Sequence, residues 1–336
     1  MDVLTELHSN NSGDPFVSTG SLPMSEMVQA LVDEAHARFK DNDDGVNASH
    51  YPALALVPRH LFGIGITGVN GREFMAGDVD TNFTMMSVAK PFTLALVCQA
   101  LGTDEVRHKV GLNPTGLPFN SIKAIELHPD RMTNPMVNPG ALATVSLAPG
   151  KTAEDKWRFI HEGLSRFAGR TLTVNDEIYT SATASNSRNR GIARILYDYK
   201  QLYFEPEETT DIYTRQSSLN VTARDLAVMA ATLANGGVNP HTQQRVIEAR
   251  HCQRVLAVMA MSGMYDTSGD WLFDIGLPAK SGVGGGIITV APGKGGMCTF
   301  APPLDAAGNS IKGQLVARFL SDRLGMNLFA SAAAAA

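Results

Sequence analysis

The 336-residue chain lacks the features that mark several classes of protein. Its three cysteines, Cys98, Cys252 and Cys298, stand far apart, so they form no metal-binding pattern and no disulfide framework. No apolar run approaches the roughly 18 residues of a membrane-spanning helix, and the start of the chain has no basic and apolar segment of the kind that directs secretion. We therefore expect reduced thiols, a cytoplasmic protein and no metal or organic cofactor.

The chain also lacks an excess of positive charge. It has 28 Lys and Arg against 33 Asp and Glu, a net charge of −5, and no basic block. Nucleic acids and anionic membranes attract basic patches, so we expect neither as a partner. What the chain does contain is a large apolar fraction, 44% of its residues, which is enough for one large domain or two modest ones.

Hydrophobic periodicity predicts the elements at the start of the chain. Apolar residues at helical spacing predict an amphipathic helix over about 25–39. Asn70 and Gly71 stand between two short apolar runs, 61–69 and 72–76, and Asn-Gly at such a place is a strong signal for a β-hairpin.

A long helical block is expected next, over about 87–264. Within it, Thr152 and Thr222 are placed to cap helices, and glycines at 169 and 236–237 are placed to end them. After the block the pattern predicts strands over 287–291 and 297–301, and then a helix over 314–324.

This order predicts an α/β fold of the α+β kind. Strands from both ends form one antiparallel sheet, the terminal helices cover one face of it, and the helical block forms a second, all-helical lobe with a site in the cleft between them. The expected limits are a flexible leader over 1–22, one domain over 23–326 with its sheet lobe at about 23–86 and 265–326, and a disordered Ala-rich tail over 327–336.

Ser87 and Lys90 form the pattern S-x-x-K and are the first candidates for catalysis. A serine hydroxyl is a weak nucleophile that needs a base within reach, and a spacing of three places both side chains on one face of a helix. Pro91 fits only the first turn of a helix, so the helix must begin near Ser87, where its dipole favours negative charge. Taken alone, the pattern equally fits a helix start with a surface lysine.

Two further motifs favour serine chemistry. Lys280 begins a Lys-Ser-Gly triplet ahead of a predicted strand, which resembles the K-[ST]-G box of serine acyl-transfer enzymes. The triplet from Ser187 to Asn189 fits the S-x-N element of the same enzymes. A simple turn or an ordinary tripeptide would explain each of them singly, but together and in this order they favour a serine nucleophile.

Longer stretches resemble the serine-dependent glutaminases, a branch of the β-lactamase and penicillin-binding-protein superfamily. The similarity runs from about residue 51 to 313 and is carried by segments 86–91, 115–120, 134–141, 229–237, 262–266, 276–283 and 302–305. It implies a divergent member with a β-lactamase-like fold. It also implies a hydrolase that cleaves the side-chain carboxamide of L-glutamine, or of a glutamine derivative, through a serine acyl-enzyme and releases ammonia.

The resemblance implies a role for each catalytic candidate. Ser87 attacks the carboxamide, Lys90 activates it as base, and Tyr265 passes protons to the departing ammonia. The backbone N–H groups of Ser87 and Val283 form the oxyanion hole. By residue type alone, a tyrosine such as Tyr265 would more often be a packing residue.

The resemblance also implies which residues hold the amino-acid end of the substrate. Asn138, Asn189 and Tyr213 match such positions, although Asn138 before a proline also fits an ordinary turn. A tyrosine of the first-strand region is matched by His50 without a gap or by Tyr51 after a one-residue deletion, and we favour Tyr51.

The sequence departs from the family at the substrate clamp. Seven residues before Asn189 the family carries a substrate-binding glutamate suited to an α-ammonium, and here Ala182 stands there. Glu177 lies five residues earlier and is not equivalent, and Pro139 stiffens the loop after Asn138. Either the substrate is not ordinary glutamine, or glutamine turns over poorly.

Three alternatives accompany this interpretation. The protein would be a non-catalytic binding protein on the same fold, a related hydrolase or acyltransferase acting on a modified glutamine, or a β-lactam-reactive enzyme. The long glutaminase-like stretches argue against the last. By analogy with the family, we expect a homodimer or homotetramer that acts on a small-molecule amide.

Overall fold

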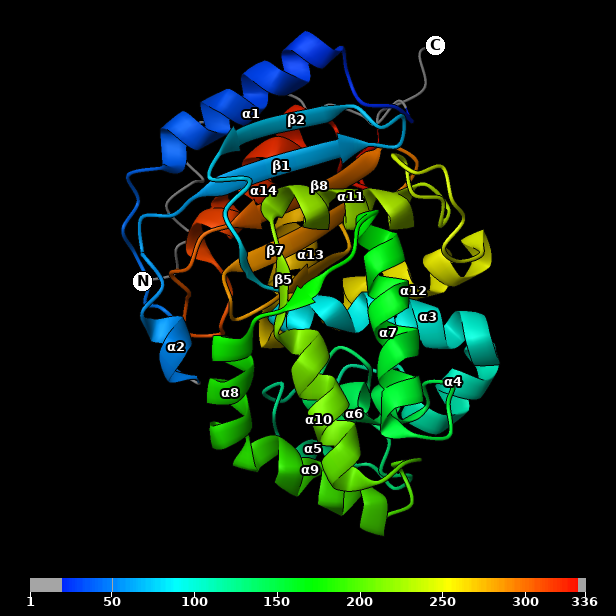
Figure 1. Cartoon of the computed structure of the whole chain (residues 1–336). Coiled ribbons are helices and arrows are strands. Elements are labelled where there is room, and N and C mark those ends of the chain that lie inside the picture. Colours follow the sequence, from blue (N-terminus) through cyan, green and yellow to red (C-terminus); the bar gives the residue numbers. More distant parts are fainter. Residues whose placement is uncertain (1–19, 50, 332–336) are drawn as a thin grey trace.

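A five-stranded antiparallel sheet forms one half of the molecule (Figure 1). Its order is β2-β1-β8-β7-β6, so strands from both ends of the chain meet at the β1–β8 pair, as predicted. The strands are β1 (Gly63–Gly68), β2 (Glu73–Gly77), β6 (Ala279–Ser281), β7 (Gly286–Ala291) and β8 (Gly295–Phe300). The computed structural model describes residues 20–49 and 51–331, so most of the predicted leader and the end of the predicted tail lie outside the described residues.

The hairpin between β1 and β2 turns at the Asn-Gly pair, as predicted. Gly71 has a φ of +81°, in the region that glycine adopts at little cost, and Gly68 donates its N–H to the carbonyl oxygen of Arg72 over 2.8 Å. β1 is buried along its whole length, because helices lie on both faces of the sheet.

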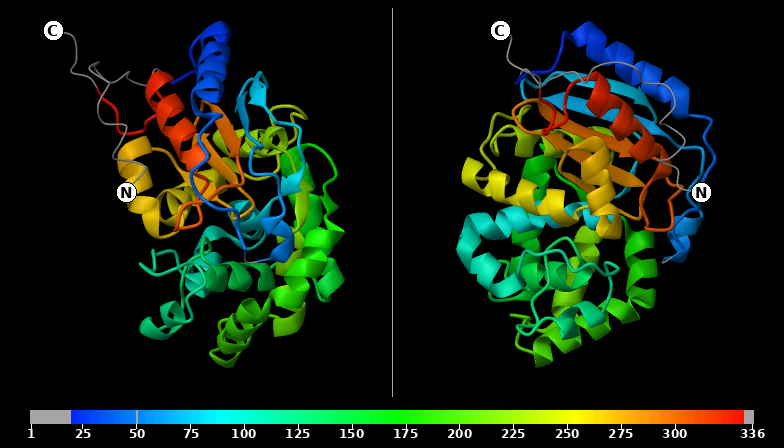
Figure 2. Two further views of the ribbon diagram at one scale, coloured as in Figure 1. Left: turned by 90° about the vertical axis from the view of Figure 1, so that its left-hand side faces the viewer. Right: turned by 180° about the vertical axis from the view of Figure 1, so that it is seen from behind.

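The terminal helices α1 (Ser25–Phe39) and α14 (Ile311–Arg323) cover one face of the sheet (Figure 2). The stripe of apolar residues predicted for α1 is the face that it buries, including Val28, Leu31 and Val32. Burying such a stripe removes apolar surface from water, which is the main favourable term that holds the helix there.

The opposite face of the sheet is covered by α11 (Ala223–Ala234), which the sequence placed in the helical lobe. This helix is buried almost all round and lies between the sheet and the other helices. Because it has no single apolar stripe, its sequence does not show which neighbour each face meets. Gly296 of β8 allows the close approach, because a Cβ there would lie 2.2 Å from the backbone nitrogen of Ala231.

The second half of the molecule is mostly helical, as predicted (Figure 1). Its helices are α2 (Pro52–Ala55), α3 (Ala89–Leu101), α4 (Thr103–Val110), α5 (Lys123–Leu127), α6 (Asn138–Ser146), α7 (Ala153–Ala168), α8 (Asp176–Ser185), α9 (Ser187–Asp198), α10 (Pro206–Ser217) and α12 (Ala249–Ser262). A further helix, α13 (Ser268–Ile275), packs against α14 and belongs to the core of the sheet half. Thr152 and Thr222 cap α7 and α11 in capping boxes with Asp155 and Asp225, which confirms both predicted caps.

The helical block also contains short strands that the sequence did not predict. β4 (Thr173–Val174) and β5 (Leu219–Val221) join β3 (Phe83–Thr84) in a second, three-stranded sheet. Strands of two or three residues are too short to show a period of two, so their pattern is invisible in the sequence.

Several smaller features bear on the sequence predictions. Cys98, Cys252 and Cys298 are all buried free thiols. Leu328 donates its N–H to the carbonyl oxygen of Gly276 over 3.0 Å, so the first residues of the predicted tail pack against the domain. Over residues 20–49 and 51–331, no helix is both long and apolar enough to cross a bilayer.

Candidate active site

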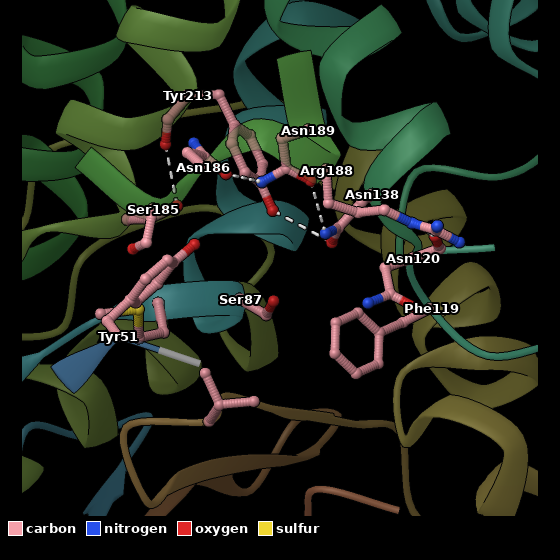
Figure 3. A pocket seen from close by; sticks show the side chains of 13 residues that line it. Tyr51, Ser87, Phe119, Asn120, Asn138, Ser185, Asn186, Arg188, Asn189 and Tyr213 are labelled. Atoms are coloured by element: carbon pink, nitrogen blue, oxygen red, sulfur yellow. Dashed lines mark hydrogen bonds between the residues drawn. The ribbon is translucent and has the colours of Figure 1, made fainter. Parts of the chain in front are cut away.

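The predicted site residues converge on a pocket of about 110 Å³ between the sheet and the helical lobe (Figure 3). Six of the eight residues that the sequence singled out line this pocket: Tyr51, Ser87, Asn138, Asn189, Tyr213 and Val283. The other two candidates, Lys90 and Tyr265, lie behind the lining and contact it through hydrogen bonds. The remaining lining residues are Met86, Phe119, Asn120, Ser185, Asn186, Arg188 and Ser217.

Ser87 stands on a tight turn at the edge of the sheet. It lies in the 3₁₀ turn η2 (Met86–Val88), directly before α3, so the predicted helix start near Ser87 is confirmed. Met86 has a φ of +47°, which is unusual for a residue with a side chain and marks a constrained turn. Such a turn holds the Ser87 hydroxyl at the pocket with only 8% of the residue exposed.

The glycines of the Lys-Ser-Gly box allow the sheet edge to reach this turn. A Cβ on Gly282 would lie 3.1 Å from the carbonyl oxygen of Met85, and one on Gly284 would lie 2.7 Å from that of Thr84. The sheet edge therefore approaches the turn closely, and Val283 lies in the pocket wall together with Ser87.

Lys90 is buried with only 2% of the residue exposed, and burial lowers the pKa of its amine to about 7. Its Nζ donates to Asn138 Oδ1 over 2.7 Å and to the carbonyl oxygen of Met136 over 3.4 Å. A neutral amine has two N–H groups and one lone pair. Since those two acceptors take both N–H groups, the lone pair is left to accept a proton.

A chain of side-chain amides links Lys90 to the far wall of the pocket. Asn138 Oδ1 accepts from Lys90 and also from the Tyr213 hydroxyl over 3.2 Å, and its Nδ2 donates to Asn189 Oδ1 over 2.9 Å. Asn189 in turn donates to Asn186 Oδ1 over 2.7 Å. These buried amides fix one another's orientation, so the two predicted asparagines form one polar network with the base.

Two buried phenols face the nucleophile. Burial raises the pKa of Tyr213 and of Tyr265 well above the usual tyrosine value, and a hydrogen bond with the Ser87 hydroxyl offsets part of the rise in each case. Tyr265 also donates its hydroxyl to the carbonyl oxygen of Ser281 over 3.0 Å. Both phenols therefore remain protonated at neutral pH and can act as proton donors.

Tyr51, the residue favoured for the first-strand tyrosine, lines the pocket. Tyr51 caps α2, lines the pocket, and has its pKa raised by burial. His50 lies outside the described residues. Figure 3 shows Tyr51 and Phe119 on opposite sides of Ser87, so an aromatic ring stands at each side of the nucleophile.

The substrate end of the pocket has no acidic side chain among its described lining residues. Ala182 lies on α8 one turn before Ser185 and is 2% exposed. The one charged lining residue is Arg188, whose Nε donates to the carbonyl oxygen of Asn120 over 3.0 Å. The sequence missed Arg188 as a lining residue, although it stands between two residues of the S-x-N motif.

Phe119 and Asn186 were also missed as separate contributors to the pocket. Phe119 falls inside a glutaminase-like segment, 115–120, so the sequence could have indicated it as a site residue. Its contact with the Tyr265 ring, 4.8 Å between centroids, could not be read from the sequence. Asn186 directly precedes the S-x-N motif; its Oδ1 accepts from Asn189, and its Nδ2 donates to Thr214 Oγ1 over 2.9 Å.

Comparisons with known proteins decide which family this site belongs to. The profile of the family described as Glutaminase matches residues 45–329. The chain is 60% identical to Glutaminase 2 of Yersinia pestis over 323 residues, covering 96% of this chain and 95% of that protein. The chain belongs to the glutaminase family. It is also 47% identical to a Brucella canis glutaminase, covering 91% of this chain and 96% of that one.

Solved structures agree with this assignment. A structure described as probable glutaminase ybaS superposes with a TM-score of 0.90 at 42% identity, covering 92% of this chain and all of that one. A Bacillus glutaminase superposes with a TM-score of 0.81 at 29% identity, covering 90% of this chain and 99% of that one. The predicted family and β-lactamase-like fold are confirmed, and the chain is a glutaminase-family amidohydrolase.

Proposed function

We propose that this glutaminase-family protein hydrolyses a side-chain carboxamide through an acyl-enzyme on Ser87. The Ser87 oxygen attacks the carboxamide carbon while its proton passes to the Lys90 amine. Tyr265 gives a proton to the nitrogen as the C–N bond breaks and ammonia leaves. Water then attacks the ester by the reverse proton path and releases the carboxylic acid, which is glutamate when the substrate is glutamine.

The observation that carries this proposal is a serine with a buried amine of lowered pKa three residues after it and a protonated phenol bonded to it. Lys90 has its pKa lowered to about 7, so a large share of it is neutral at neutral pH. Tyr265 stays protonated and hydrogen bonds to Ser87. A group suited to take a proton and a group suited to give one are therefore buried at the same pocket: Lys90 is bonded to Asn138 of its lining, and Tyr265 is bonded to Ser87 itself.

The oxyanion hole belongs to the same proposal. The backbone N–H groups of Ser87 and Val283 are its expected donors, and both residues line the pocket. The close approach that Gly282 and Gly284 permit supports this role, because it brings the Val283 backbone to the nucleophile turn.

A substrate without a free α-ammonium is a second candidate. Asn138, Asn189, Tyr213 and Tyr51 are proposed to hold the substrate, and each offers neutral hydrogen-bonding groups. Because no Asp or Glu is found among the described lining residues, an ammonium would have no ionic partner there. An N-acylated glutamine or a simple primary amide would need none.

Trapping the acyl-enzyme tests the proposal. Incubation with a glutamine analogue that carries a reactive diazoketone in place of the amide should add its mass to the peptide that contains Ser87, as measured by mass spectrometry. An ammonia assay over glutamine, N-acetylglutamine and other primary amides then identifies the substrate. Labelling of another residue, or no ammonia from any amide, would contradict the proposal and favour a non-catalytic binding protein.

A homodimer or homotetramer in the cytoplasm completes the proposal. Exposed aromatic side chains at Tyr197 of α9, at Tyr199 directly after it and at Phe273 of α13 support an interface between copies. Light scattering on a size-exclusion column would give the mass of the assembly, and a monomer at micromolar concentration would contradict this part.

A further inference from the structure

Lys280 is a completely buried lysine that the proposed mechanism does not use. It lies in β6, and none of its surface is exposed. Its Nζ donates to the carbonyl oxygen of Gly263 over 2.9 Å and to that of Ser281 over 2.6 Å. A neutral amine has two N–H groups, and these two acceptors take both of them.

The two carbonyl groups lie on either side of Tyr265. Gly263 precedes Tyr265 by two residues, and Ser281 O also accepts the Tyr265 hydroxyl over 3.0 Å. The Lys280 Nζ lies 4.1 Å from the centroid of the Tyr265 ring. The Lys280 amine therefore bonds the backbone just before Tyr265 and the carbonyl group that accepts the Tyr265 hydroxyl. It also lies against the Tyr265 ring.

The backbone at Tyr265 needs such support. Its φ is +57°, in the left-handed region that residues with side chains rarely adopt, and it opens a 3₁₀ turn, η3 (Tyr265–Thr267). A conformation of this kind persists only where the surroundings determine it. Ser281 reinforces the same link, because its N–H donates to the Gly263 carbonyl oxygen over 3.2 Å.

Lys280 is suited to donate hydrogen bonds without adding a positive charge to the site. Burial, and then the positive charge of Lys90, lower the pKa of Lys280 far below the usual lysine value. A neutral Lys280 adds no positive charge beside Lys90, so the base keeps its own lowered pKa.

We propose that Lys280 is a positioning residue, which fixes the Tyr265 hydroxyl beside Ser87 by bonding the carbonyl groups of Gly263 and Ser281. The inference rests on the proposed function of Tyr265 as the proton donor to the leaving ammonia. It predicts that Lys280 matters for leaving groups that need a proton and little for those that do not.

Lys280→Met is the primary test, because it keeps an unbranched apolar stem of four heavy atoms and removes the amine. We expect kcat for the amide substrate to fall by about a hundredfold, as a misplacement of about 1 Å can cause, with KM within about threefold of the parent value. The matched control is Lys156→Met. Lys156 is also buried, donates to two carbonyl groups, those of Ser146 and Ala148, and lies 4.8 Å from the Phe204 ring centroid.

The control lysine lies at the far end of α6 from Asn138, about 12 Å along the helix by the rise of 1.5 Å per residue. We expect Lys156→Met to lower the melting temperature and leave kcat within about twofold. A similar fall of kcat in both variants would mean that losing any buried lysine impairs the enzyme, and it would overturn the positioning role.

Two readouts separate positioning from simple destabilisation. First, adding Lys280→Met to the Tyr265→Phe variant should lower kcat by a further factor of less than about three, since the effects of groups that act as one unit are not additive. Second, the loss should shrink to below about fivefold on a γ-thioester of the same substrate, because a thiolate leaves without a proton. Additive losses, or equal losses on amide and thioester, would overturn the inference.

Lys280→Gln is a second variant that tests the same role if Lys280→Met folds poorly. Its amide offers two N–H donors on a shorter side chain, so we expect a kcat between that of the parent and that of Lys280→Met. The loss of kcat should again be smaller on the thioester than on the amide. Losses in both variants that merely follow the folded fraction, measured by circular dichroism, would overturn the inference. If Tyr265→Phe itself remains fully active, the proposed role of Tyr265 fails first.

Discussion

The two ends of the pocket differ in how firmly they are built. At the reaction end, Ser87, Lys90 and Tyr265 are all buried and joined by hydrogen bonds to the sheet edge or to the amide network. At the other end, Ser185 and Arg188 on α8 and α9 are exposed, and their described neighbours in the lining include no acid.

This difference separates chemistry from selectivity. The reaction end requires a fixed geometry, because a base and a proton donor must both reach one oxygen. The substrate end tolerates change, because replacing one side chain alters which substrate binds and leaves the reacting groups in place. Substitutions at the two ends should therefore affect different kinetic parameters.

The largest expected effect is at the nucleophile. Ser87→Ala and Lys90→Ala should each abolish turnover of the amide, and the double variant should be little worse than either, because the two act as one unit. Ammonia release measured at matched folded concentration gives the comparison. Activity retained in Ser87→Ala would remove the covalent mechanism, and additive losses would mean that Lys90 acts elsewhere.

The next effect compares the two phenols beside Ser87. Tyr265→Phe deletes one hydroxyl and should lower kcat by about 10² to 10⁴, the usual contribution of a positioned acid or base. Tyr213→Phe removes the bonds to Asn138 and to Ser87 but leaves Tyr265 as the proton donor, so it should act more on KM than Tyr265→Phe does and less on kcat. Steady-state kinetics of both variants test this contrast. A lower melting temperature with unchanged kcat in Tyr265→Phe would make that residue structural.

The fold was predictable where the sequence pattern is local. The Asn-Gly hairpin, the α1 stripe and the caps at Thr152 and Thr222 all depend on a few neighbouring residues, and each is present. The position of α11 depends on which of two partners its apolar surface meets. That choice is made by tertiary packing, including the close approach at Gly296, and leaves no trace in local pattern.

The site was predictable in its members and less so in its contacts. The motifs identified Ser87 and Lys90, but not that Lys90 bonds Asn138, because residues 48 positions apart show no spacing rule. Lys280 was visible only as the first residue of a motif. Its bonds to two carbonyl groups around Tyr265 depend on how β6 meets the end of α12.

A smaller effect concerns pH and belongs to the reaction end alone. Lys90 must be neutral to accept the serine proton, and burial sets its pKa at about 7. The protonated form grows as pH falls, so kcat/KM should decline about tenfold per pH unit below about 7 and level off above it. A profile of kcat/KM from pH 5 to 9 measures this. A flat profile across pH 7 would exclude Lys90 as the base.

The smallest expected effect is a gain at the substrate end. Ala182→Glu would place a carboxylate on α8, at the position that the family resemblance assigns to a substrate-binding glutamate. If Ala182 faces the substrate's amino group, kcat/KM for free glutamine should rise at least about tenfold, the low end of a charged hydrogen bond. N-acetylglutamine should bind more weakly, because the buried carboxylate would meet no cation.

The matched control for this gain is Ala184→Glu, which adds the same charge two residues along α8 at an exposed position. It should change kcat/KM for either substrate by less than about twofold, since an exposed charge is screened by water and salt. Paired measurements of both substrates on both variants decide the matter. If Ala182→Glu affects the two substrates equally, position 182 is not the amine site. In that case the selectivity of this pocket arises from the neutral amides around Asn189, while the serine chemistry at the other end is untouched.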